Sequence, residues 1–155
     1  MFPDDVYRSH LSDTIAALET WAQSMADCAA IETQMQPSFW KMSVVPRAAG
    51  PCPFELMLRA DQQFNAEIGG EVYEDKPVDA FSFFPMLARA IGDGRVERIS
   101  VKNALTGALE AIETRVTLED GWAWIGERRL VARSQRKADA AQVQSTHRYL
   151  PYRRK

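Results

Sequence analysis

Residues 54–68 alternate between apolar and polar side chains, with a polar break at Asp61-Gln62-Gln63. A period of two places successive side chains on opposite faces of a strand, so the stretch predicts two strands that each bury one face. Because the break between them is short, the strands are expected to pair as an antiparallel hairpin. The apolar members of the pattern are Phe54, Leu56, Leu58, Ala60, Phe64, Ala66 and Ile68. A fold that accepts this hairpin needs an antiparallel sheet with an apolar layer against one face.

Further strands are predicted on both sides of this hairpin. Residues 38–47 alternate in the same way, and so do residues 96–103. A second hairpin is predicted over 112–125, where Glu119-Asp120-Gly121 provides the turn, and residues 128–132 extend its return strand. Gly69-Gly70 predicts a bulge inside the strand that continues to Tyr73.

Two helices and a weaker third are predicted around these strands. Apolar residues at spacings of three and four predict a long helix over 4–32, and Pro37 prevents its continuation. A short second helix has Ser82 or Asp79 as its N-cap and Gly92 as a left-handed C-cap. Residues 135–147 form a weak helical pattern with Ser134 as a cap. The predicted order is α-βββ-α-βββ, which is an α+β fold with an antiparallel sheet.

Charge divides the chain unevenly. Residues 1–127 contain 10 Lys and Arg against 20 Asp and Glu, whereas residues 128–155 contain 9 basic residues and one acidic residue. The length of 155 residues fits one domain, which we place over 1–133, followed by a basic C-terminal extension over 134–155. We expect this extension to dock on the acidic body or on a second copy; a solvated tail and a polyanion-binding tail are the alternatives.

The sequence contains no catalytic, cofactor-binding or metal-binding motif. His10 and His147 are the only histidines, and neither has neighbours that would form a nucleophilic or acid-base site. Cys28 and Cys52 are isolated, which argues against zinc and favours a reducing, cytoplasmic compartment. No apolar run approaches the ~20 residues of a membrane span. We therefore predict no catalytic residue, no cofactor and no metal.

Two groups of residues are candidates for binding. The extension mixes arginine with tyrosine, a composition typical of interface anchors and of single-strand binders, at Arg148, Tyr149, Tyr152, Arg153 and Arg154. A pocket between the sheet and the first helix would be lined by Trp21, Trp40 and Phe64. Trp122 and Trp124 share one face of their strand, where they either fill the core or form an exposed patch.

Three functions follow from these features. The first is a small non-catalytic binding or adaptor protein whose partner is another protein or a second copy in a homodimer. The order of helices and strands resembles that of small acidic secretion chaperones, a likeness of element order alone. The second is a small-molecule or enzymatic pocket between the sheet and the first helix. The third is nucleic-acid binding through the extension, which the acidic body disfavours.

Overall fold

The computed structural model describes residues 1–130 and 141–153 as two helices and nine strands in two antiparallel sheets. This confirms the α+β class. Five strands follow one another as a meander in the first sheet: β1 (Ala29–Met35), β2 (Phe39–Pro46), β3 (Phe54–Arg59), β4 (Gln63–Ile68) and β5 (Glu71–Pro77). The predicted 54–68 hairpin is confirmed as β3 and β4, with Leu58 opposite Phe64.

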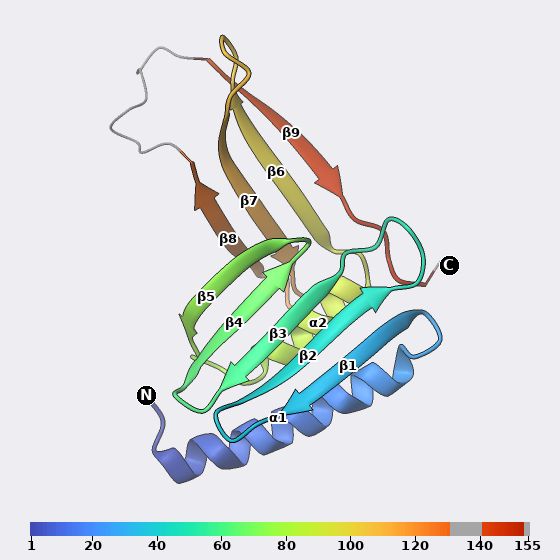
Figure 1. Cartoon of the computed structure of the whole chain (residues 1–155), viewed down its shortest axis with the longest axis vertical. Coiled ribbons are helices and arrows are strands. Elements are labelled where there is room, and N and C mark those ends of the chain that lie inside the picture. Colours follow the sequence, from blue (N-terminus) through green and yellow to red (C-terminus); the bar gives the residue numbers. More distant parts are fainter. Residues whose placement is uncertain (131–140, 154–155) are drawn as a thin grey trace.

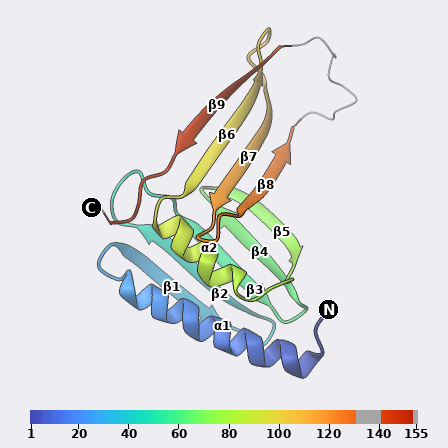
Figure 2. The ribbon, with the colours of Figure 1, turned by 180° about the vertical axis from the view of Figure 1, so that it is seen from behind.

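Both helices cover one face of this sheet (Figures 1 and 2). They are α1 (Asp4–Ser24) and α2 (Phe83–Gly92). Alternate side chains of β2, β3 and β4 point toward the helices and are almost completely buried, as the alternation predicts. Residues of the first helix and of both hairpins are buried, and all but Ile112 belong to one core cluster; they are Leu18, Met25, Leu56, Leu58, Phe64, Ile68, Ile112 and Val116.

The second sheet has the order β8-β7-β6-β9 and extends away from the first (Figure 1). Its strands are β6 (Val96–Asn103), β7 (Leu109–Thr117), β8 (Ala123–Arg129) and β9 (Gln142–Arg148). The predicted hairpin over 112–125 is confirmed as β7 and β8, with Thr117 opposite Ala123. The tyrosine hydroxyl of Tyr73 donates to the hydroxyl of Thr114 over 2.6 Å and joins the two sheets.

The first helix ends earlier than its apolar spacing predicts. It stops at Ser24, and after a turn the chain continues as β1, which pairs with β2 from Ala29 opposite Pro46 to Met35 opposite Trp40. The prediction of one helix over 4–32 is therefore wrong at its C-terminal end. The physical reason is tertiary: the sheet satisfies the backbone of 29–35 and accepts β-branched Ile31 and Thr33 better than a helix does.

The prediction of a weak helix over 135–147 is also wrong for the part of this range that the structure describes. Gln142–Arg148 is strand β9, paired with β6 from Glu97 opposite Arg148 to Asn103 opposite Gln142. The predicted cap Ser134 and the start of that helix lie outside the described residues. The predicted order had three strands before the second helix and three after it. Among the described residues five strands precede α2 and four follow it, because β1, β5 and β9 are additional strands. Residues 142–148 are thus part of a sheet, while the domain boundary at 133 stays a prediction.

Glycines take different roles from those predicted at two positions. Gly69 and Gly70 have φ of +59° and +90° and form the turn between β4 and β5, while the register shift lies between Phe64 and Ala66. The left-handed residue after α2 is Gly94, with φ of +78°, and the helix itself includes Gly92. Ser82 precedes α2 as expected, although its side chain makes no capping hydrogen bond.

Candidate functional site

Tyr152 and Arg153 pack against the ends of both helices. Tyr152 is 4% exposed, its hydroxyl donates to the carbonyl of Cys52, and its N–H donates to the carbonyl of Gly92 over 2.9 Å. Arg153 donates to the carbonyl of Ser24 and pairs with the carboxylate of Asp27 at 2.5 Å. The Arg153 hydrogen bond lowers the pKa of Asp27. We call residues 149–153 the C-terminal strap.

The other tail candidates also contact their own chain. Arg148 pairs with Glu97 at 3.2 Å, although its side chain is highly exposed. Tyr149 is half-buried, with the guanidinium of Arg98 5.8 Å from its ring centroid and the ring of His147 against its edge at 4.7 Å. Arg154 lies outside the described residues.

The three predicted pocket residues lie in different surroundings. Trp40 is 1% exposed and belongs to the packed core between the sheet and the helices. Trp21 is half-buried on α1, with its ring 5.8 Å from that of Phe54. Phe64 is buried too, but one side of it faces a surface hollow at the start of α2.

This hollow has a volume of about 320 Å³ and is mainly apolar. Strand β4 supplies Phe64, β5 ends beside it, and the chain then turns into the first residues of α2. The ring of Phe64 lies 5.8 Å from that of Phe83 and 5.1 Å from that of Phe84. We call it the aromatic hollow; its walls are Phe64, Lys76, Pro77, Asp79, Ala80, Phe83, Phe84 and Trp124.

Trp124 brings the second sheet to this hollow. Its half-buried ring packs on edge against Tyr73 with 5.2 Å between centroids, and the neighbouring Gly126 lets the Tyr73 ring approach the backbone closely. Burial raises the pKa of Tyr73. Trp122, two residues earlier, is 76% exposed. The two tryptophans therefore differ: Trp124 packs against the core, and Trp122 is a surface residue.

The pocket predicted from the sequence lay between the sheet and the first helix, whereas the aromatic hollow lies at the start of α2 and shares only Phe64 with the predicted set. The run Phe81-Ser82-Phe83-Phe84 contains more aromatic rings than one face of a short helix buries, which is the signal available in the sequence. The approach of Trp124 depends on how the two sheets pack, and no local pattern encodes that contact.

The two histidines and the two cysteines of the described residues lie in four different segments of the chain. No group of three or more His, Cys, Asp and Glu in residues 1–130 and 141–153 is arranged to hold a metal ion. His10 stacks on Phe81 at 5.5 Å, far from His147 on β9. Burial raises the pKa of the Cys52 thiol to about 12, so it is protonated at neutral pH and is a poor nucleophile.

Comparisons with other proteins do not assign the chain to a family. No family model, curated protein or solved structure matches it. In the described part of the chain, neither helix combines the length and apolar character needed to cross a bilayer.

Proposed function

We propose that the protein is a non-catalytic binding protein whose aromatic hollow receives one apolar side chain of a partner polypeptide. The observation that carries this proposal is an open space of about 320 Å³ walled mainly by aromatic rings, with Lys76 and Asp79 as its charged members. Aromatic walls bury a guest side chain with little loss of conformational entropy of their own.

The size of the hollow limits its guest. Small-molecule pockets span ≈ 300–1,000 Å³, so this hollow lies at the lower end of that range. Specific ligands are oriented by several converging polar groups, whereas here two exposed charged residues of opposite sign lie beside apolar walls. That arrangement suits an apolar anchor residue with polar flanks, the usual form of a binding hot spot.

Other functions have weaker support. A small apolar molecule in the same hollow is the second candidate, because the buried rings of Phe64 and Phe84 offer it an apolar floor. Nucleic-acid binding through the tail is less favoured, since Arg148 and Arg153 already pair with carboxylates. A second copy as the partner, and a cytoplasmic location, stay predictions.

The proposal can be tested with blocked amino acids as probes. Titrating N-acetylphenylalaninamide into the isotope-labelled protein is expected to shift the indole signal of Trp124 and the amides around Phe83, with millimolar affinity. Ala80→Glu places a charge on an exposed wall of the hollow and is expected to weaken binding about tenfold. Ala17→Glu, on the exposed face of α1, is the matched control and should bind normally.

The size of the probe separates the two candidates. A blocked peptide of about ten residues with one central phenylalanine should bind more tightly than the single blocked residue, because its flanks add contacts. Equal or weaker peptide binding would favour a small-molecule site. Absence of any shift at Trp124, or an Ala80→Glu protein that binds as well as the control, would reject the hollow as a binding site.

A further inference from the structure

Strand β1 forms one edge of the five-stranded sheet, and its outer side has free backbone groups. Hydrogen bonds from Arg47 N–H to the carbonyl of Cys28, and between Gln36 and Phe39 in both directions, fix which residues face β2. Bonding alternates along an antiparallel pair, so Ala30, Glu32 and Gln34 bond to β2. Ile31, Thr33 and Met35 consequently turn their N–H and C=O groups away from the sheet, where no strand among the described residues pairs with them.

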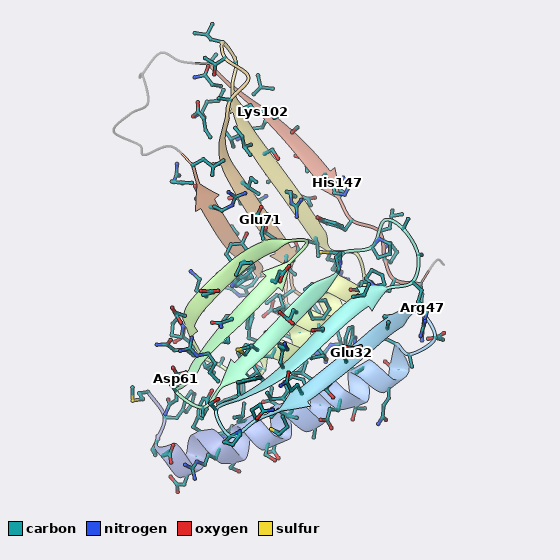
Figure 3. The ribbon with its side chains drawn as sticks, in the orientation of Figure 1. Glu32, Arg47, Asp61, Glu71, Lys102 and His147 are labelled. Carbon is teal, nitrogen blue, oxygen red and sulfur yellow. The ribbon has the colours of Figure 1, made fainter. Side chains whose placement is uncertain are left out.

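A groove runs along this edge beside α1. It has a volume of about 500 Å³ and lies between the second half of the helix and the side chains of β1 that point toward it. Figure 2 shows α1 lying along β1. Figure 3 shows Arg47 near the N-terminal end of the same strand. We call this space the α1–β1 groove; it is lined by Glu19, Ala22, Gln23, Ala26, Ala29, Ile31, Thr33 and Arg47.

We propose that an extended segment of a partner polypeptide binds here as a sixth strand. Its backbone bonds to the outward groups of Ile31 and Thr33, and every second side chain enters the α1–β1 groove. The short side chains of Ala22 and Ala26 leave room for branched aliphatic residues at these positions. The surface is distinct from the aromatic hollow, which adjoins β5 at the opposite edge of the same sheet.

The other sheet edges lack this combination of features. Strand β5 has the charged run Glu74-Asp75-Lys76 and ends at Pro77, and Asp75 has a left-handed φ of +57°. Strand β8 ends in the charged run Glu127-Arg128-Arg129. Charges, prolines and irregular backbone are devices that block strand addition. Strand β9 has no buried side chain on either face.

Charge indicates what kind of segment fits. Helix α1 carries four acidic residues, Asp4, Asp5, Asp13 and Glu19, against one basic residue, Arg8. Among the walls of the groove itself, Glu19 is the acidic member and Arg47 the basic one. A second copy paired through β1 would bring two such helices together on one face of the joined sheet, and their like charges would repel. A partner segment with lysine or arginine between its aliphatic residues is attracted instead. We therefore assign the groove to a basic, β-forming segment of a different protein.

Two proline substitutions test whether the partner segment forms hydrogen bonds with the backbone of β1. Thr33→Pro removes an outward N–H from β1 without removing a bond to β2. Thr146→Pro is the matched control, because Tyr149 N–H bonds to Val96 and the alternation then turns the Thr146 N–H outward on β9. The probe is a blocked peptide of about ten residues that alternates valine with lysine. We expect Thr33→Pro to weaken its binding at least tenfold and Thr146→Pro to leave it within about twofold.

Further variants keep the test decisive if Thr33→Pro does not fold. Ala26→Trp fills the exposed groove and should also weaken the peptide about tenfold, while Ala104→Trp in the exposed β6–β7 turn should not. A peptide with glutamate in place of lysine should bind more weakly. Three results would each overturn the proposal. The first is an equal effect of the two proline substitutions, and the second is equal affinity for the acidic peptide. The third is a dimer in sedimentation that Thr33→Pro dissociates. Ala80→Glu should leave peptide binding unchanged, so this result is separate from the test of the aromatic hollow.

Discussion

The hydroxyl of Tyr152 donates a hydrogen bond to the carbonyl of Cys52, one hundred residues earlier in the chain. Around this contact the C-terminal strap crosses three elements that are distant in sequence. Leu150 N–H bonds to the carbonyl of Gly50, Tyr152 N–H bonds to that of Gly92, and Arg153 reaches Asp27 after α1. The strap therefore ties the β2–β3 loop to the ends of both helices.

Tyr152→Ala is expected to destabilise the protein by about 3–5 kcal/mol, the usual loss when a large buried ring is removed. Tyr152→Phe, which keeps the ring, should cost about 1 kcal/mol. Arg153→Ala should destabilise the protein far less than Tyr152→Ala, because its ion pair is exposed. Denaturant titration measures all three, and half-molar salt should reduce only the arginine contribution. Equal losses for Tyr152→Ala and Arg153→Ala would contradict a strap anchored by its ring.

A pair of glycine variants tests how closely the strap packs. Gly94 and Gly107 both have positive φ, +78° and +71°, so alanine at either position costs about 1–2 kcal/mol of backbone strain. A Cβ at Gly94 would also lie 2.5 Å from the backbone nitrogen of Pro151, whereas one at Gly107 would meet open space. Gly94→Ala should therefore lose a further about 1–3 kcal/mol of unfolding free energy. Equal losses would show that the strap moves aside freely.

The ion pair between Glu71 and Arg128 joins the two sheets, and Figure 3 shows Glu71 at their junction. The Arg128 hydrogen bonds, at 2.8 and 3.1 Å, lower the pKa of the nearly buried Glu71 below its ordinary value. A lowered pKa means that this stabilisation is present above about pH 4.5 and is lost as the pH falls through the folded-state pKa. Arg128→Gln should lower the free energy of unfolding at pH 7, and the difference from the parent protein should shrink below pH 4. A difference that is constant with pH would contradict the pairing.

The parts of the fold that local patterns encode were predictable. The alternation from Phe54 to Ile68 specified a hairpin, because a shift by one residue would expose Leu56 and Leu58 to water. The boundary between α1 and β1 was not predictable from local sequence. Met25 and Ala29 continue the helical spacing, and the pairing with β2 that overrides this spacing involves residues that follow them in the chain. The same holds for β9, whose strand pairing depends on β6, a strand that lies far earlier in the chain.

The residues of the candidate site were also only partly predictable from local sequence. Phe64 could be chosen from the sequence as an apolar member of the alternation, but the expected pocket lay on the side of the first helix and not at the start of α2. The sequence pattern places Trp122 and Trp124 on one face of a strand, but Trp122 precedes β8 and is exposed, whereas Trp124 lies on β8 and packs against Tyr73. The C-terminal candidates were chosen by composition, and their partners Cys52, Gly92 and Asp27 come from three other segments.

All four tyrosines have raised pKa values, principally because each is removed from water. That of Tyr7, whose hydroxyl donates to the carbonyl of Arg59, is raised to about 12. A raised pKa favours the neutral phenol in the folded state, so its stabilisation is complete below pH 10 and is lost as the pH rises toward the folded-state value. Tyrosinate absorbance should therefore stay low through pH 10 and then rise together with loss of the circular dichroism of the fold. In concentrated urea the same groups should titrate near their ordinary pKa of 10. A tyrosine that ionises near pH 10 in the intact fold would contradict the burial of that ring.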